Sequence, residues 1–286
     1  CLGCGGCAER RWGRKQPCAR AMRHKGLGYA QGHLPFKLQG VFPLLSPSQV
    51  CPVPTLSLDT SCIRAISIDL DDTLWPIWPT IAKAEQVVLH WLTLHAPATA
   101  RLFANTEALR AIRNQMVALR PDLVHDLSAL RLESIRLALQ QAGDEPALAE
   151  PAFDVFFDQR QRVELFDDAH DTLAFLSARY PVVAVSNGNA DVHRVGIGHY
   201  FKASISAKDF GVPKPDVRIF HAAAQAAQVQ PHEVLHIGDD ATADAQGALA
   251  ASMQAVWLNT AGHDWPHPER PHATVASLTH LCRLLG

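Results

Sequence analysis

Two short acidic segments contain residues that could attack an electrophile and hold a cation. Residues 69–73 read Asp-Leu-Asp-Asp-Thr, and residues 238–240 read Gly-Asp-Asp. Each segment directly follows an apolar run, which distinguishes it from an acidic cluster in a solvated turn. Clustered carboxylates can hold a divalent cation, and one carboxylate among them can act as a nucleophile. The two segments therefore predict a cation-dependent nucleophilic site.

Two further segments could complete such a site. Residues 186–188 read Ser-Asn-Gly, and a hydroxyl and backbone N–H groups at the end of a strand could donate hydrogen bonds to a ligand. Lys214 is a basic residue that is followed by a proline. An Asn-Gly pair alone is more often a turn, and a lysine before proline can be an ordinary loop residue. The interpretation therefore depends on where the fold brings these segments.

The elements that must position these residues alternate between strand and helix. Residues 65–70 form a β-branched run that predicts a buried strand. After Asp168 the pattern predicts helix 169–179, strand 182–186, helix 190–199, strand 203–206, helix 216–228, strand 234–238, helix 242–251 and strand 255–258. This alternation is typical of an α/β fold with a doubly wound parallel sheet. Ligands bind beyond the carboxyl ends of such strands, where the charged motifs lie.

The chain between the first two motifs is predicted to be helical. Residues 80–160 carry apolar side chains at helical spacing, and prolines and a glycine divide them into about four helices. We therefore expect three parts: a disordered or non-native extension over residues 1–61, a Rossmann-like catalytic core over residues 62–74 and 168–286, and an all-helical cap over residues 75–167.

The ordered set of motifs resembles the haloacid-dehalogenase-like superfamily, and within it the phosphatases with a small inserted helical cap. The resemblance covers about residues 62–286. It implies a phosphoric monoester hydrolase that requires Mg²⁺ and acts on a small phosphorylated metabolite, as a monomer or homodimer. Residues 75–79, Trp-Pro-Ile-Trp-Pro, lead into a cap similar to that of bacterial phosphatases for flavin mononucleotide or the phosphorylated pyrimidine of riboflavin synthesis.

The resemblance also implies which residues react and which bind the metal. Asp69 would attack phosphorus and carry an aspartyl-phosphate, while Asp71 would protonate the leaving alcohol and later take a proton from water. Mg²⁺ would be bound by the Asp69 carboxylate, the backbone carbonyl of Asp71 and Asp239, with Asp240 as a water-mediated partner. Asp240 could equally be a helix cap. Ligands that are all oxygens are typical of a hard cation rather than zinc.

The other site residues would bind the phosphate or support the acids. By their positions in the motifs, Thr73, Ser186 and the Asn187 backbone would contact substrate. Lys214 would balance charge at the nucleophile and the phosphate, and Asp244 would orient Lys214 or the metal shell.

Three large side chains near the motifs have two interpretations each. Trp75 and Trp78 could stack on a flat substrate ring, but ordinary packing of the cap explains them equally well. His236 lies inside a predicted strand, where a packed residue is expected rather than a ligand.

Three other functions fit part of the pattern. A 2-haloacid dehalogenase of the same superfamily uses the same nucleophile without metal, but its pattern lacks the second acid, which is present here as Asp71. A phosphomutase keeps both acids and a helical cap, so the sequence does not separate it from a phosphatase. A non-catalytic binding module on this scaffold would be expected to have lost an acid, and fold alone does not decide function.

The composition restricts the partners and the compartment. With 48% hydrophobic and 19% charged residues and a net charge of −2, the chain gives no reason to expect nucleic acid or a membrane as a partner. Five of the seven cysteines lie in the basic residues 1–60, and a body so poor in cysteine is expected of a reduced cytoplasmic enzyme. The spacing of Cys1, Cys4 and Cys7, with Cys18, allows a zinc site but lacks a second Cys-x-x-Cys pair.

Overall fold

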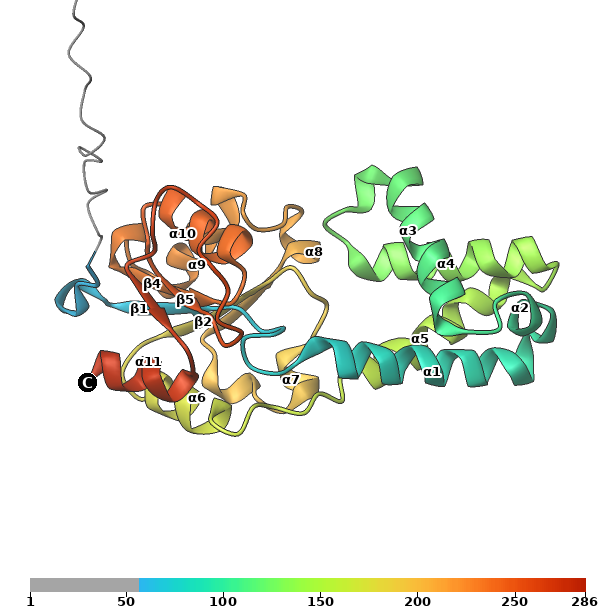
Figure 1. Ribbon diagram of the computed structural model, residues 1–286, viewed down its shortest axis with the longest axis horizontal. Helices are drawn as coiled ribbons and strands as arrows, with labels where there is room; N and C mark the ends of the chain where they lie inside the picture. The colour runs from blue at the N-terminus through green and yellow to red at the C-terminus, as the bar shows by residue number, and fades with distance from the viewer. Residues whose placement is uncertain (1–56) are drawn as a thin grey trace, which may run out of the picture. The chain divides into compact units, whose positions relative to one another are not determined.

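The computed structural model describes residues 57–286, which contain one parallel sheet of six strands (Figure 1). The cysteines of the possible zinc site and most of the predicted extension lie outside these residues. The strands lie in the order β3-β2-β1-β4-β5-β6, and every neighbouring pair is parallel. Their bounds are Ala65–Ile68 (β1), Val182–Ser186 (β2), Ala203–Ser206 (β3), Val234–Gly238 (β4), Gln254–Leu258 (β5) and Ala273–Val275 (β6).

The helices of residues 57–286 fall into two groups. Five lie between β1 and β2 and precede α6: Ile77–His95 (α1), Pro97–Leu102 (α2), Thr106–Leu119 (α3), Leu127–Ala142 (α4) and Ala149–Arg160 (α5). The others, together with the six strands, form what we call the sheet domain: Ala169–Ser177 (α6), Val192–Val195 (α7), Ala207–Phe210 (α8), Val217–Ala227 (α9), Gly247–Ala250 (α10) and Leu278–Leu285 (α11). None of these helices is long and apolar enough to span a membrane.

The sheet is covered by helices on both faces. Successive strand side chains point to opposite faces, so Ile66 and Ile68 pack in one core with α6 and α11, while Val183 and Val185 pack in another with α9 and α10. Figure 1 shows α9 and α10 on one side of the sheet and α6 and α11 on the other. Strands β1, β2 and β4 are buried along their whole length, and their sequences are mainly apolar, with Ser67 and His236 as buried polar exceptions within β1 and β4. The predicted α/β, doubly wound class is confirmed.

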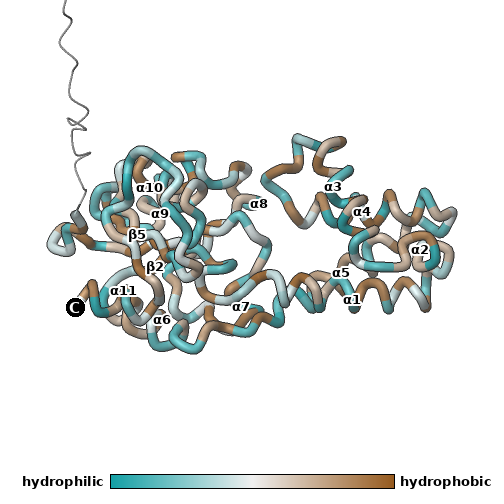
Figure 2. The backbone as a smooth tube through the Cα atoms, viewed as in Figure 1, coloured by the Kyte–Doolittle hydropathy of each residue, from teal (hydrophilic) through white to brown (hydrophobic). Residues whose placement is uncertain are grey.

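Helices α1–α5 and the segments that join them, which we call the helical insert, have a separate apolar core. Val88 and Leu92 of α1 pack there against residues such as Leu139 of α4 and Phe156 of α5. Figure 2 shows apolar and hydrophilic residues alternating along α1, as expected of a helix with one buried face. The insert has five helices where about four were predicted. The domain boundaries assigned from the sequence stay predictions.

The two connections of the helical insert to the sheet lie side by side. The backbone N–H of Phe166, after α5, donates a hydrogen bond to the carbonyl of Leu74, before α1, with an N···O distance of 2.9 Å. Leu74 is fully buried, so this junction is part of the core of the sheet domain.

Several short elements differ from the prediction. The helix predicted over residues 190–199 is reduced to α7, because Gly196 adopts a left-handed conformation (φ 94°) and ends it. The helix predicted over residues 242–251 begins as a π-helical turn, Ala241–Gln246, and continues as α10. The short elements α8, β6 and α11 were not predicted, because each has only three to eight residues.

Candidate active site

The predicted motifs converge at the carboxyl ends of the three central strands. Asp69 follows β1, Ser186 ends β2 and Asp239 follows β4, and these strands are direct neighbours. The backbone N–H of Asp69 donates to the carbonyl of Ile237 at 2.9 Å, which fixes the first acidic segment beside the last. A cavity of about 250 Å³ lies there, and among the residues that line it are Asp69, Asp71, Ser186, Asn187, Lys214, Asp239, Asp240 and Asp244.

Lys214 is buried between two carboxylates. Its Nζ lies 2.5 Å from Oδ1 of Asp69 and 2.5 Å from Oδ1 of Asp244. Burial by itself lowers the pKa of Lys214, but the charges of Asp244 and Asp69 outweigh it and raise the pKa overall. The lysine is therefore a fixed positive charge next to the predicted nucleophile, with Asp244 as its second ion-pair partner. The predicted role of Asp244 in orienting Lys214 or the metal shell stays a prediction.

The loop that carries Lys214 is fastened by the side chain of Asn187. The amide nitrogen of Asn187 donates to the Lys214 carbonyl at 3.0 Å, and its amide oxygen accepts from the Lys214 N–H at 2.7 Å. The Ser186 hydroxyl accepts a hydrogen bond from the Gly188 N–H at 2.9 Å. The side chain of Asn187 thus has a structural task, and its backbone remains the group predicted to contact phosphate.

A buried polar chain continues from Asp244 to His236, which sequence reasoning treated only as a packed residue. His236 is fully buried, and burial lowers its pKa, so its imidazole is neutral. Its Nε2 lies 3.2 Å from Oδ1 of Asp244, and its Nδ1 lies 2.8 Å from the Ser67 hydroxyl. Burial raises the pKa of Asp244, but the opposing effects of Lys214 and His236 are larger, so its pKa is lowered overall. The acid is therefore ionised and accepts the hydrogen of Nε2.

The acids Asp69 and Asp239 have raised pKa values. For Asp69 burial is the largest cause; Lys214 opposes it, while Asp244 and Asp239 add to it. For Asp239 burial and then Asp244 raise the pKa to about 7. Lys214 alone therefore does not balance the charges of Asp69, Asp239 and Asp244, and a bound cation would neutralise the remaining negative charge.

Three acids of the cavity are close enough to share a metal ion. Asp69, Asp239 and Asp244 offer carboxylate oxygens that lie within 4.8 Å of one another. Two buried carboxylates, of Asp69 and Asp244, and the half-buried carboxylate of Asp239 are a donor set that fits Mg²⁺. Asp244 already accepts hydrogen bonds on both oxygens, from Lys214 and His236 on Oδ1 and from the Asp240 N–H on Oδ2. Asp69 and Asp239 are therefore better placed for direct contact with the ion.

Two predicted site residues occupy supporting positions. Thr73 is fully buried outside the cavity lining, and its hydroxyl donates to Oδ1 of Asp239 at 2.9 Å. It therefore orients an acid, and the predicted substrate contact stays a prediction. Asp240 lines the cavity, but its side chain caps the π-helical turn, with the N–H groups of Thr242 and Ala243 donating to Oδ1 at 2.8 Å. Its water-mediated contact with metal likewise stays a prediction.

Asp71 is enclosed by groups from both the sheet and the helical insert. The indole N–H of Trp75 donates to its Oδ1 at 2.8 Å, and Nη2 of Arg160 lies 2.7 Å from both carboxylate oxygens. Trp75 is fully buried, so it does not stack on a ligand, whereas Trp78 is 60% exposed. Arg160 was not predicted, because it ends α5 outside every motif.

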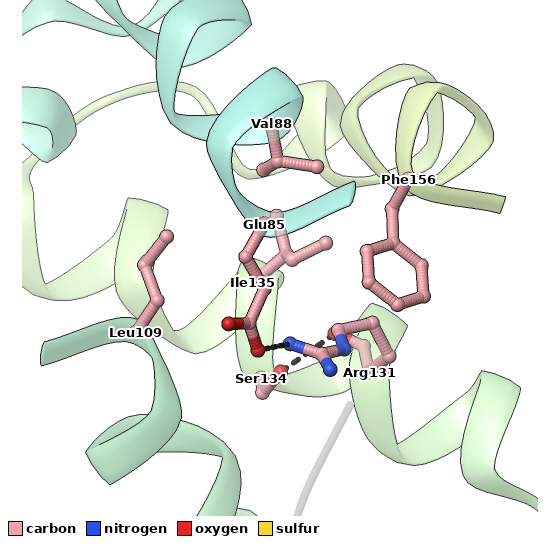
Figure 3. Close-up of a pocket in the computed structure, with 7 residues that line it drawn as sticks. All are labelled: Glu85, Val88, Leu109, Arg131, Ser134, Ile135 and Phe156. Atoms are coloured by element: carbon pink, nitrogen blue, oxygen red, sulfur yellow. Dashed lines mark hydrogen bonds and ion pairs between the residues drawn. The ribbon is translucent and has the colours of Figure 1, made fainter. Parts of the chain in front are cut away.

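A separate buried ion-pair cluster lies within the helical insert. Glu85 accepts from Nε of Arg110 at 2.6 Å and from Nη1 of Arg131 at 3.3 Å. Figure 3 shows Arg131 with the Glu85 carboxylate on one side and the Phe156 ring on the other, and its guanidinium carbon lies 4.3 Å from the ring centroid. Burial lowers the pKa of Arg131 to about 10, although Glu85 opposes it. The pocket around this cluster contains none of the motif residues.

Known proteins resemble the chain in sequence and in structure. The model of the haloacid dehalogenase-like hydrolases matches residues 63–252. The chain is 34% identical to the 5-amino-6-(5-phospho-D-ribitylamino)uracil phosphatase YigB of Escherichia coli, over 78% of this chain and 96% of that protein. It is 33% identical to a phosphoserine phosphatase of Thermus thermophilus, over 49% and 57% of the two chains. The 2-haloacid dehalogenase structure from Pseudomonas syringae pv. Tomato DC3000 is 35% identical, with a TM-score of 0.73 over 78% and 98%.

Proposed function

Because this chain belongs to the haloacid dehalogenase-like hydrolases, we propose that it is a Mg²⁺-dependent phosphatase that forms an aspartyl-phosphate on Asp69. One observation carries the proposal: Lys214 bridges Asp69 and Asp244 at the strand ends, in the cavity that also contains Asp71. A positive charge fixed next to a buried carboxylate prepares that carboxylate for contact with an anionic phosphoester.

The residues divide the two chemical steps between them. In the first step an oxygen of Asp69 forms a bond to phosphorus, the bond from phosphorus to the ester oxygen breaks, and Asp71 gives its proton to the leaving alcohol. In the second step water attacks the phosphorus, Asp71 takes a proton from it, and the bond to Asp69 breaks. The Ser186 hydroxyl and the Asn187 backbone hold the phosphoryl oxygens, and Lys214 balances their charge.

Asp69 and Asp239, with the backbone carbonyl of Asp71, are the residues that would hold Mg²⁺. When bound, the ion supplies positive charge that lets an anionic nucleophile approach an anionic phosphate. Thr73 keeps Asp239 oriented through the hydrogen bond of 2.9 Å, and Asp244 keeps Lys214 in place.

We infer that the alcohol part of the substrate lies in a second cavity. It has a volume of about 240 Å³ and shares Leu127 with the cavity of the acids. Its lining combines apolar side chains, such as Phe156, with the polar groups of Arg113 and Asn114. Such a lining suits a leaving group that has both a flat apolar surface and carbonyl acceptors. We therefore propose flavin mononucleotide or the phosphorylated pyrimidine of riboflavin synthesis as the substrate, which the similarity to YigB supports.

The test is a hydrolysis screen over phosphorylated metabolites that includes both compounds, with released phosphate as the measured product. Activity should require Mg²⁺, disappear with EDTA and be absent from Asp69→Asn. Mass spectrometry of protein quenched in acid during turnover should detect a phosphoryl group on Asp69. Full activity in EDTA would refute the metal requirement, and full activity of Asp69→Asn would refute the nucleophile.

A 2-haloacid dehalogenase is the second candidate, because the structure from Pseudomonas syringae carries that name at 35% identity. Asp71 argues against it, since the dehalogenase pattern lacks this second acid. Halide release from 2-chloropropionate, measured beside phosphate release from the screen, discriminates the two functions. Halide release that is metal-independent, without phosphate release, would favour the dehalogenase.

A further inference from the structure

Resting on the proposed function, we propose that Arg160 is a positioning residue that holds the Asp71 carboxylate in the orientation needed for proton transfer. Arg160 is the last residue of α5 in the helical insert, whereas Asp71 follows β1 in the sheet domain. The insert thereby contributes directly to the acid and base steps, in addition to shaping the cavity for the alcohol.

The guanidinium of Arg160 is held on two sides. It is 1% exposed, and its Nη2 lies 2.7 Å from both oxygens of Asp71. Its Nε donates to the Asn189 side-chain oxygen at 3.1 Å, and the Asn189 amide nitrogen donates to the Ser128 hydroxyl at 3.1 Å. Ser128 lies in α4, so the chain of hydrogen bonds begins and ends in the insert and passes through the loop after β2. The guanidinium therefore cannot shift without breaking contacts to both parts.

Asp71 has little freedom left once Arg160 is in place. Trp75 donates to Oδ1, and Gly188 lies against Oδ2, since a Cβ at that glycine would be 2.1 Å from this atom. The side chain of Asp71 is nevertheless 19% exposed, toward the cavity that contains Asp69. Charge-assisted hydrogen bonds from guanidinium and indole thus fix a carboxylate that remains accessible to a reacting oxygen. Proton transfer depends on such positioning, because small misplacements cost large factors in rate.

Stability alone does not account for the position of Arg160. Its Nη1 is buried and has no hydrogen-bond partner among residues 57–286. A buried charged group with an unsatisfied donor costs free energy, so a well-packed apolar residue would serve the fold at least as well. The contact with Asp71 accounts for the arginine as a residue that positions the proposed proton donor.

The experiment compares Arg160→Gln and Arg160→Lys with the full-length wild type on two Mg²⁺-supported substrates. One is 4-nitrophenyl phosphate, whose leaving group needs little protonation. The other is the alkyl phosphate that the wild type hydrolyses fastest among flavin mononucleotide, ribose 5-phosphate and glycerol phosphate. Arg194→Gln is the matched control, because Arg194 also pairs with an acid of α5, Asp158, but on the exposed surface. Thermal melts check that each variant is folded.

We expect Arg160→Gln to lower the first-turnover rate on the alkyl phosphate by about 10–100-fold and the first-turnover release of nitrophenol by less than about threefold, with KM nearly unchanged. Arg160→Lys loses the contact to Asn189 but keeps a positive charge next to Asp71. Its loss of rate should therefore be smaller than that of Arg160→Gln. In an Asp71→Asn background, Arg160→Gln should cause no further loss, because it acts through Asp71. Arg194→Gln should match the wild type.

Two results would overturn the inference while leaving the phosphatase function intact. Equal losses of first-turnover rate on both substrates in Arg160→Lys and Arg160→Gln would indicate a merely structural role. Additive losses in the double variant would show that Arg160 does not act through Asp71. If Arg160→Gln does not fold, Arg160→Lys alone decides by the same comparison. A wild type without Asp69-dependent phosphate release would overturn the proposed function and this inference together.

Discussion

Gly188 lies so close to Asp71 that a Cβ atom at residue 188 would be 2.1 Å from Oδ2 of the carboxylate. We predict that Gly188→Ala displaces this carboxylate and lowers kcat on alkyl phosphates by about 10–100-fold. Steady-state kinetics provide the measurement. In an Asp71→Ala background the clash with the carboxylate is gone and only the contact with Ser186 Oγ, at 3.2 Å, remains. Adding Gly188→Ala there should therefore lower the residual rate much less than it lowers the rate of the wild type. Wild-type turnover by Gly188→Ala would contradict the prediction.

The two acids of the first motif should fail in different ways when each is replaced by asparagine. Asp69→Asn removes the proposed nucleophile, so hydrolysis of every phosphoester should fall to background. Asp71→Asn keeps the nucleophile and its own backbone carbonyl, so an alkyl phosphate should react about 10²–10⁴-fold more slowly, while 4-nitrophenyl phosphate loses less in the first step.

Rapid-quench kinetics separate these outcomes. Asp71→Asn should release a burst of nitrophenol and then turn over slowly, because Asp71 is also the residue proposed to activate the water that hydrolyses the aspartyl-phosphate. Equal losses on both substrates without a burst would exclude Asp71 as the acid and base.

The raised pKa of Asp239 predicts a stability that depends on pH. In the unfolded chain this acid loses its proton near its ordinary pKa of about 3.9, whereas in the folded protein it holds the proton until about pH 7. The folded state thus binds more protons between these values, so the free energy of unfolding without metal should fall as pH rises from about 4 to 7, by at most about 1.4 kcal/mol per pH unit for this group.

Urea denaturation in EDTA at pH 5 and pH 8 measures this effect. Asp239→Asn should show a smaller decrease than the wild type between the two pH values. Addition of Mg²⁺ to the wild type should stabilise it more at pH 8 than at pH 5, because the ion and the proton compete for the same carboxylate. The same pH dependence in wild type and Asp239→Asn would reject the assignment.

We expect Glu85 to be important for stability, and its partner Arg131 also lines the cavity proposed for the alcohol. Glu85→Ala leaves the buried guanidinium of Arg131 without its partner, and breaking a buried ion pair in this way costs about 3–5 kcal/mol. Urea denaturation measures the loss. Glu164→Gln, which breaks the exposed pair with Lys83, is the control and should not change the unfolding transition. Should Glu85→Ala be as stable as the control, the ion pair contributes nothing to the fold.

The sequence could predict the sheet and the meeting of the motifs because both follow from local patterns. The apolar runs before Asp69 and Asp239 each identify a buried strand, and parallel strands place their carboxyl ends at one edge. The interaction of Lys214 with Asp69 bridges 145 residues, and no periodicity shows it. It was found because the order of motifs resembled a family.

Other features depended on tertiary contacts that leave no local signal. Arg160 lies 89 residues from Asp71 and ends a helix like any other arginine, so nothing in the sequence indicated their contact. The role of His236 was missed for a similar reason, because a histidine in a strand is equally compatible with simple packing. The π-helical turn that contains Asp244 was predicted as ordinary helix, because π-helical turns are rare and occur mostly as single turns within α-helices.

The hydrogen bond between Phe166 and Leu74 means that the two ends of the helical insert are adjacent where they join the sheet domain. An insert whose ends are adjacent can be replaced by a longer, shorter or differently lined insert without a change in the order of the strands or in the positions of the acids. A protein with a different insert could therefore hydrolyse phosphate esters of other alcohols by the same chemistry. In this chain such a replacement has one condition, because the new insert must also contain a residue that contacts Asp71 as Arg160 does.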